Sequence, residues 1–253
     1  MALLEVADIE VRFGGVVALD GLSFSVERHE ICALIGPNGA GKTTLFNCVS
    51  RLYQPSAGRI TFDGQDLLAL EPHQIARIGV ARTFQNLALF PALTVLENVM
   101  VGAHTAGSVG FGRAMLRIGV GREERRLRAD CRAILDRLDL GHLADRRAVG
   151  LPFGTLKRLE FARALASEPT LLLLDEPANG LTHGEVDELG DTIREIRDQF
   201  DLTILLVEHH MAMVMAISDQ VVVMEFGRKI AEGPPAQIRN DPKVIEAYLG
   251  APA

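Results

Sequence analysis

Apolar and polar positions alternate in the first part of the chain, which predicts β-strands over residues 3–35. The alternating apolar residues are Leu4, Val6, Ile9, Val11 and Phe13, then Leu22, Phe24 and Val26. Residues 30–35 form a short apolar run, as expected of a buried strand, and Gly36 follows the run. A helical pattern begins at Lys42, and further strands are expected at 58–64 and 80–84.

The middle of the chain has helical spacing instead. We expect helices over 94–101, 122–138 and 155–167. The charged positions of 122–138 are predicted to face solvent. Residues 102–121 hold six glycines without a clear period, which predicts a surface loop.

Short apolar strands and helices alternate again in the last third. Strands are expected at 171–174, 203–207 and 221–224, helices at 184–199 and 211–217, and short helices opened by Pro234 and Pro242. This alternation predicts the α/β class, with a mostly parallel sheet covered on both faces. A helical segment, 87–168, interrupts it.

Composition and charge exclude several classes of protein. The chain has 253 residues, 48% of them apolar, which excludes disorder as its main state. Its 26 basic and 33 acidic residues give a net charge of −7, whereas nucleic-acid binders usually carry a basic excess, so no nucleic-acid partner is expected. The longest apolar run, 211–217, is far shorter than the ~20 residues of a membrane-spanning helix.

The cysteines and the N-terminal residues indicate a cytosolic protein. Cys32, Cys48 and Cys131 are odd in number and widely spaced, so they are predicted to be reduced packing residues, not a disulfide framework or zinc site. The N-terminal sequence MALLEVADIEVRF lacks the basic start and apolar stretch of a signal peptide.

One motif between a strand and a helix predicts a phosphate-binding loop. It fits G-x-x-x-x-G-K-[ST] and consists of Gly36, Pro37, Asn38, Gly39, Ala40, Gly41, Lys42 and Thr43. Glycines let backbone N–H groups surround phosphate oxygens, and the helix N-terminus attracts the same anion. Lys42 can reach the β- and γ-phosphates, Thr43 can ligate Mg²⁺, and Thr44 can add a phosphate contact.

A second motif places two carboxylates after a buried strand. Residues 171–174 are leucines, and Asp175 and Glu176 follow. Ligands of open α/β sheets bind at this end of the strands. Asp175 is predicted to hold Mg²⁺, and Glu176 to act as general base on water. The two motifs together predict nucleoside-triphosphate hydrolysis or phosphoryl transfer.

With these motifs the sequence resembles the ATP-binding-cassette (ABC) ATPases over nearly its whole length. The resemblance implies a P-loop core of ABC type at 1–86 and 169–253, with N-terminal antiparallel strands, and an inserted helical subdomain at 87–168. It implies ATP and Mg²⁺ as ligands, Gln85 as a catalytic residue that meets Mg²⁺, and His209 as the switch histidine at the γ-phosphate. Phe13 lies where an aromatic ring stacks on adenine, and 178–182 match a dimer-contact loop. No second ligand follows His209 and His210 at helical spacing, so zinc is not expected there, and His210 is predicted to have no catalytic duty.

The signature loop of the family departs from its usual form here. In place of L-S-G-G-Q the chain has Leu151, Pro152, Phe153, Gly154 and Thr155. Gly154 still allows backbone approach to a phosphate, but Pro152 offers neither a hydroxyl nor an N–H group. Thr155 is a candidate cap for the following helix. Two family members pair head to tail, and each signature loop completes the partner's ATP site. The change should therefore weaken the partner's site. A heterodimer with a subunit that has the usual loop would keep one fully active site, whereas a homodimer would carry the defect in both sites, so we expect a heterodimer.

Four segments resemble the ATP-binding subunits of branched-chain amino acid uptake systems. They are RFGGVVALD, RTFQNLALFPALTVLENV, EHHM and IRNDPKVIEAYLG. This resemblance implies an ATPase that powers import of such an amino acid, or a related amino acid or amide. Its partners would be a second ABC ATPase, integral membrane permeases and, indirectly, a solute-binding protein. The chain would be soluble when isolated and would bind peripherally to the cytoplasmic face of the membrane. Residues 102–121, predicted above to be a surface loop, could alternatively contact the permease.

Two other functions stay open at this point. One is a soluble cassette ATPase that drives assembly or remodelling, because the core motifs are the same in both. The other is a regulatory cassette that binds ATP without hydrolysing it. The altered signature loop favours the regulatory cassette, whereas the intact Lys42, Asp175 and Glu176 oppose it.

Overall fold

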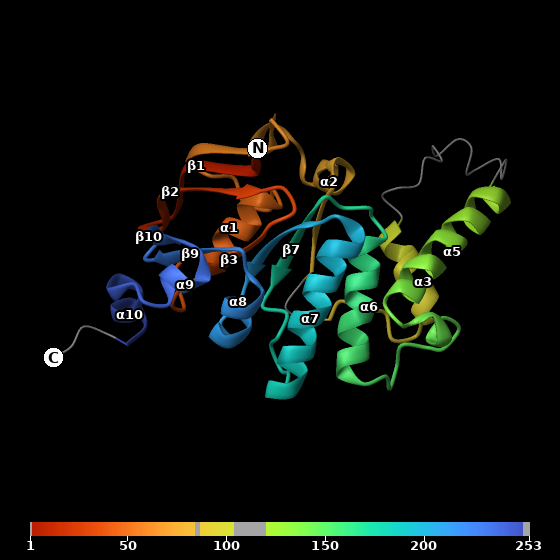
Figure 1. Cartoon of the computed structure of the whole chain (residues 1–253). Coiled ribbons are helices and arrows are strands. Elements are labelled where there is room, and N and C mark those ends of the chain that lie inside the picture. The colour runs from red at the N-terminus through yellow and green to blue at the C-terminus, as the bar shows by residue number, and fades with distance from the viewer. Residues whose placement is uncertain (1, 84–86, 104–119, 250–253) are drawn as a thin grey trace. The chain divides into compact units, whose positions relative to one another are not determined.

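The computed structural model describes residues 2–83, 87–103 and 120–249. Contacts divide the chain into two compact units, which are described separately below (Figure 1). The larger unit comprises Met1–Ile75 and Thr170–Ala253, and the smaller unit Ala76–Pro169. The first division thus follows Ile75, whereas the sequence placed the start of the inserted segment at residue 87. Within the described residues, every helix is too short or too polar to span a membrane.

The N-terminal strands form an antiparallel sheet in the order β2-β1-β4-β5. Its strands are β1 (Ala2–Phe13), β2 (Val16–Glu27), β4 (Ala57–Phe62) and β5 (Gln65–Asp66). The alternation along β1 shifts between Val6 and Ile9, where the strand register is irregular and Asp8 has φ 50°. Ser23 holds this irregularity, because its hydroxyl oxygen accepts from the Asp8 N–H at 2.8 Å. Val6 and Ile9 are therefore both buried.

The second sheet of the larger unit has the strand order β10-β9-β3-β8-β7. Its strands are β3 (Ile31–Ile35), β7 (Leu171–Asp175), β8 (Thr203–Val207), β9 (Gln220–Glu225) and β10 (Arg228–Gly233). The first four are parallel, and β10 is antiparallel to β9. Every residue of β3, β7 and β8 is buried, which explains their unbroken apolar runs. The sequence analysis did not predict β10.

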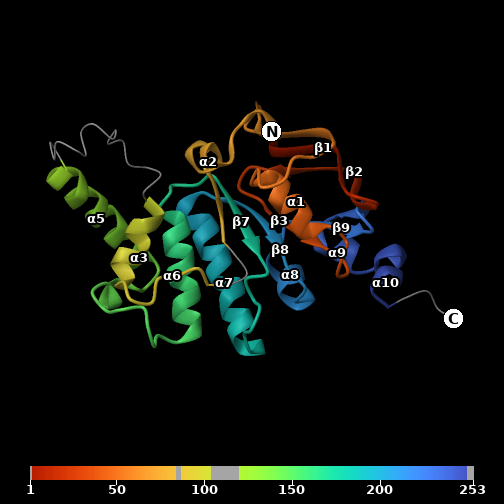
Figure 2. The same cartoon turned by 180° about the vertical axis from the view of Figure 1, so that it is seen from behind.

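The helices of the larger unit are α1 (Lys42–Val49), α2 (Pro72–Ile75), α7 (His183–Phe200), α8 (Met211–Ile217), α9 (Pro235–Ile238) and α10 (Pro242–Leu249), with a 3₁₀ turn at Leu67–Ala69. Helices α8, α9 and α10 pack on one side of β3 and β9 (Figures 1 and 2). Their buried contacts join Val214, Ile238 and Val244 to Ala33, Ile35, Val221 and Val223. The predicted helices opened by Pro234 and Pro242 are confirmed.

The smaller unit contains β6 (Val80–Arg82), α3 (Val95–Gly102), α5 (Val120–Arg137) and α6 (Phe153–Leu165), with 3₁₀ turns at Ala76–Ile78 and Gly141–Leu143. A capping box of Thr94 and Glu97 opens α3. Helix α6 begins at Phe153, two residues before the predicted start at 155. Thr155 therefore lies inside its first turn and does not cap it. The cap position is Pro152, where the missing N–H group costs no helical hydrogen bond. Of the predicted loop 102–121, residues 104–119 lie outside the described residues.

Candidate functional site

Two glycines of the phosphate loop lie where no side chain fits. The loop joins β3 to α1, and its glycines Gly36 and Gly41 have φ 151° and 102°. A Cβ atom on Gly36 would lie 2.1 Å from the Met224 carbonyl oxygen, and one on Gly41 2.5 Å from the Ala18 carbonyl oxygen. Both neighbours are backbone atoms of adjacent strands, which cannot move aside. The glycine pattern is therefore required by the packing of the loop against β2 and β9.

The loop leads directly into the N-terminus of α1. Gly41 occupies the cap position, and no side chain caps the first turn. The N–H groups of a first turn have no partner within the helix, so they can donate to an anion. Thr43 is exposed in this turn and Thr44 is half-buried. The hydroxyl of Thr43 can therefore reach a ligand at the helix end.

Lys42 is a buried cation held by the loop itself. Its Nζ donates to the carbonyl oxygens of Gly36 at 2.6 Å and Pro37 at 3.0 Å. Burial lowers the pKa of the Lys42 ammonium, and the charges of Glu176 and Asp175 act in the opposite direction. The structure thus brings together the cation and the two carboxylates that the sequence singled out.

Asp175 and Glu176 lie at the end of β7 beside the end of β8. Asp175 is the last residue of β7 and is buried, and Glu176 is half-buried. The Glu176 N–H donates to the Val207 carbonyl oxygen at 2.8 Å. Glu176 also has φ 47°, a left-handed conformation that is uncommon for a residue with a side chain. Such conformations concentrate at functional sites because the surrounding structure must hold them.

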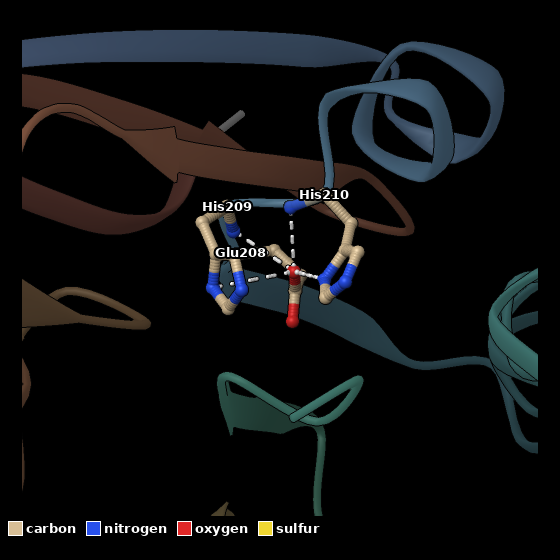
Figure 3. A group of neighbouring side chains, drawn as sticks. All are labelled: Glu208, His209 and His210. Atoms are coloured by element: carbon tan, nitrogen blue, oxygen red, sulfur yellow. Dashed lines mark hydrogen bonds and ion pairs between the residues drawn. The ribbon is translucent and has the colours of Figure 1, made fainter. Parts of the chain in front are cut away.

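Glu208 organises the loop that follows β8 (Figure 3). Glu208 is buried, with 1% of the residue exposed. One carboxylate oxygen accepts from the Ala178 N–H at 3.1 Å, and the other accepts from the N–H groups of His209 and His210, each at 2.8 Å. The second oxygen also lies 2.8 Å from Nδ1 of His210. The imidazole of His209 is 57% exposed, with Nδ1 3.9 Å from the same oxygen, beyond hydrogen-bond distance.

These three side chains also have the composition of a metal site. Their candidate ligand atoms lie within 4.8 Å of one another. One carboxylate oxygen, however, already accepts two backbone N–H groups and faces Nδ1 of His210. A metal at this oxygen would have to displace those donors and leave buried N–H groups without acceptors. The hydrogen bonds therefore account for the cluster without a metal.

The family resemblance also assigned roles to Phe13 and Gln85, of which the structure describes only Phe13. Phe13 is 47% exposed, so it does not pack in the interior. Its ring meets the edge of Tyr53 at a centroid distance of 5.2 Å. The sequence did not indicate Tyr53 as the neighbour of Phe13, because Tyr53 lies in the segment after α1, where no periodic pattern of apolar residues marks it. Gln85 lies outside the described residues.

The two predicted dimer-contact segments have defined conformations. In the larger unit, 178–182 form a turn in which Gly180 has φ 83° and Thr182 opens α7 with a capping box. In the smaller unit, Leu151 is buried, whereas Pro152 and Phe153 are exposed and Gly154 and Thr155 are half-buried. The Lys157 ammonium lies 5.8 Å from the centre of the Phe153 ring. A buried ion pair of Lys157 and Glu160, 3.3 Å apart, follows in α6.

Comparison with known proteins decides the family. The model of the ABC transporter family matches residues 19–179. The chain belongs to the ABC transporter ATPases. A model described as branched-chain amino acid ATP-binding cassette transporter also matches residues 228–253. The ABC-type P-loop fold, ATP as a ligand and an ATPase activity, which the sequence predicted, are therefore confirmed.

Relatives of this chain match over nearly their full length. The chain is 43% identical to the high-affinity branched-chain amino acid transport ATP-binding protein BraF of Pseudomonas aeruginosa over 249 residues, 98% of each chain. It is 44% identical to LivG of Escherichia coli K12, which has the same description, over 98% of each chain. A crystal structure of the ADP conformation of an ABC transporter cassette has a TM-score of 0.87 and 33% identity, and the match covers 99% of this chain and 100% of that one.

Two residues of this ABC ATPase were not predicted from the sequence as parts of the site. The sequence pattern marks Glu208 only as part of the segment EHHM, although this acid directly follows the apolar strand β8. Tyr248 is in the C-terminal segment, and its hydroxyl accepts from the backbone of Gly36. Burial raises the pKa of Tyr248 to about 12, and the hydrogen bond with Gly36 opposes this shift. Tyr248 and Ile35 line one cavity of about 620 Å³, so α10 reaches the start of the phosphate loop.

Proposed function

We propose that this chain is the ATP-hydrolysing subunit of an importer of branched-chain amino acids, or of a related amino acid or amide. The observation that carries the ATPase part is the proximity of Lys42 to Asp175 and Glu176 at the end of the parallel strands. The transported solute is inferred from the printed functions of the 43% and 44% identical relatives. The same relatives do not support an assembly ATPase.

The residues of the larger unit divide the work of hydrolysis among them. The loop Gly36–Thr44 would bind the phosphates of ATP through backbone N–H groups of residues after Pro37, and Lys42 would turn from the loop carbonyls to the β- and γ-phosphates. Hydroxyl and carboxylate oxygens suit Mg²⁺, so Thr43 and Asp175 would hold it. The family resemblance adds Gln85, which belongs to the smaller unit and lies outside the described residues. The bound Mg²⁺ would neutralise charge that develops on the phosphates. Glu176 would take the proton of the attacking water, His209 would contact the γ-phosphate, and Phe13 would stack on adenine.

A second cassette ATPase would complete the site in a head-to-tail dimer. In this proposal Leu151–Thr155 contact the ATP bound to the partner, and Gly154 lets the backbone approach its γ-phosphate. Pro152 supplies neither a hydroxyl nor an N–H group there, which weakens the partner's site. We therefore propose a heterodimer in which the site built on Lys42 and Glu176 is the more active one.

The inserted segment 87–168 would transmit the closure of the dimer to the membrane. Permease subunits would be separate chains that bind this segment on the cytoplasmic face, and a solute-binding protein would deliver the solute. The chain is thus a peripheral membrane protein in this proposal. ATP binding would close the two cassettes, and release of phosphate would reopen them.

Purification of the tagged chain from solubilised native membranes tests the proposal. We expect a second cassette ATPase and polytopic permeases to co-purify, and the complex in proteoliposomes to take up leucine, isoleucine or valine only with ATP. Glu176→Gln should abolish uptake, whereas the matched change Glu195→Gln on the exposed face of α7 should not. Recovery of non-membrane partners alone, from well-solubilised membranes, would contradict the transporter function.

The asymmetry of the dimer has its own test. Glu176→Gln is introduced in this chain alone, and phosphate release by the mixed dimer is measured. We expect most of the turnover to disappear. Near-full residual turnover would show that the partner's site does the work. Turnover unchanged by Glu176→Gln in every assembly that contains it would favour a regulatory cassette.

A further inference from the structure

A single buried carboxylate connects the two loops that carry Glu176 and His209. Glu208 is 1% exposed and lies at the end of β8, between β3 and β7 in the sheet. One of its oxygens faces the turn after β7, where the Ala178 N–H donates to it at 3.1 Å. The other faces its own loop, where the N–H groups of His209 and His210 donate to it. Figure 3 shows both histidine rings beside this carboxylate.

The hydrogen bonds on Glu208 make this connection stiff. Three backbone N–H groups and one imidazole nitrogen converge on its two oxygens, and an ionised carboxylate can accept all of them. Hydrogen bonds to a charged acceptor are shorter and stronger than those between neutral groups. The ring of His210, only 27% exposed, fixes the orientation of the carboxylate through Nδ1. Neither loop can shift without breaking a hydrogen bond to the buried carboxylate of Glu208.

Both proposed catalytic residues are tied closely to Glu208. Glu176 lies two residues before Ala178, whose N–H group bonds to Glu208, and the N–H group of His209 bonds to Glu208 itself. Ala178 is buried and lies two residues after Glu176, in a turn closed by the Asn179 N–H on the Glu176 carbonyl oxygen. His209 is anchored through its own N–H group, while its exposed ring is free of a hydrogen bond to Glu208. The backbone of His209 is therefore fixed and its ring can still turn toward a ligand.

We propose that Glu208 is a positioning residue that sets the general base Glu176 and the switch residue His209 relative to each other. Glu208 acts through the Ala178 and His209 N–H groups and touches neither nucleotide nor water itself. His210 keeps the carboxylate of Glu208 oriented and has no direct contact with substrate. This inference rests on the proposed ATPase function and deepens it.

Glu208→Gln is the sharpest test, because it keeps the shape of the side chain and replaces one oxygen with an NH₂ group. In either orientation of the amide, that NH₂ group faces an N–H donor, so one loop loses its acceptor. We expect kcat for ATP hydrolysis to fall about 10-fold or more, and KM for ATP to stay within about twofold, because misplacement of catalytic groups lowers the rate without weakening phosphate binding. Glu195→Gln, on the exposed face of α7, is the matched control and should change neither constant.

The combination with His209→Ala separates positioning from general destabilisation. If Glu208 acts through His209 and Glu176, adding Glu208→Gln to His209→Ala should lower kcat by less than it does alone. A kcat for Glu208→Gln within about twofold of the unaltered protein would overturn the proposal. Fully multiplicative losses in the double variant, or a rise in KM equal to the fall in kcat, would do so as well.

Amide hydrogen exchange of the unaltered full chain keeps the proposal testable if Glu208→Gln does not fold. We expect the N–H groups of Ala178, His209 and His210 to be protected and to share one protection factor, which reports the free energy of opening, because one carboxylate holds all three. Clearly different protection factors at Ala178 and His209 would overturn the proposal. This measurement needs no ATP hydrolysis, so it separates failure of the positioning role from failure of the proposed function.

Discussion

The Lys42 ammonium donates to the Gly36 carbonyl oxygen at 2.6 Å, so the cation of the phosphate loop closes on the first residue of that loop. Gly36 itself lies against the Met224 carbonyl oxygen of β9 and allows no side chain. Gly36 begins the loop and is fixed by close packing, whereas Lys42 ends the loop and holds it through a charged hydrogen bond. Both roles can be tested separately.

Lys42→Ala removes the charge that the proposed mechanism places on the β- and γ-phosphates. We expect kcat/KM for ATP hydrolysis to fall about 100-fold or more, a loss typical of a deleted donor to a developing negative charge. Phosphate release and binding of an ATP analogue measure the two parts of this effect. Lys243→Ala, on an exposed position of α10, is the control and should leave both unchanged. Unaltered hydrolysis in Lys42→Ala would contradict the site.

Gly36→Ala and Gly39→Ala separate close packing from backbone conformation. The new Cβ at residue 36 would clash with backbone at 2.1 Å, whereas at residue 39 it would meet no atom within 4 Å. Both glycines have positive φ, which costs about 1–2 kcal/mol for alanine. We expect Gly39→Ala to lose about that much unfolding free energy and Gly36→Ala about 3 kcal/mol or more, because overpacking adds to the strain. Urea unfolding measures both, and equal losses would contradict the packing.

Tyr248 should make stability depend on pH in the alkaline range. Its pKa rises from 10.0 to about 12 on folding, chiefly through burial. Between these values the unfolded chain has lost the phenol proton and the folded chain keeps it. The unfolding free energy contributed by Tyr248 is therefore complete below pH 10 and falls as the pH rises towards 12.

Tyr248→Phe removes this titration and keeps most of the ring packing. We expect the urea midpoint of the unaltered chain to fall more than that of Tyr248→Phe between about pH 9 and about pH 11. The comparison cancels the titration of the other groups. Parallel curves for the two proteins would show that the partly exposed Tyr248 does not keep its hydroxyl against Gly36 in solution.

The cysteines should be inert in the folded protein. Burial raises the pKa of Cys48 and of Cys131 to about 11, and that of Cys32 well above its usual range. Because the thiolate is the reactive form, a thiol reagent at about pH 8 should label the native chain very slowly. All three cysteines should react once the chain is unfolded in urea. Rapid stoichiometric labelling of the native chain would contradict their burial.

Much of the fold follows from local patterns in the sequence. The unbroken apolar runs of β3, β7 and β8 predicted buried parallel strands, because both faces of such strands are covered. Loop composition predicted the phosphate loop, since Gly36 and Gly41 stand where only glycine fits. The pattern could not reveal β10, which is a partly exposed edge strand with charged residues. It also misplaced the start of α6, because Pro152 serves as a cap without a capping side chain.

The sequence by itself determined the phosphate loop, the acids Asp175 and Glu176 and the family to which they point, because these depend on residues that are adjacent in the chain. Only the tertiary structure decided that Glu208 connects Ala178 with His209, and that Tyr248 reaches Gly36. These partners are 30 and 212 residues apart in the sequence. They meet because the parallel sheet brings the ends of β7 and β8 side by side and because α10 folds back on the face of β3. Contacts of that kind leave no periodic trace in the sequence.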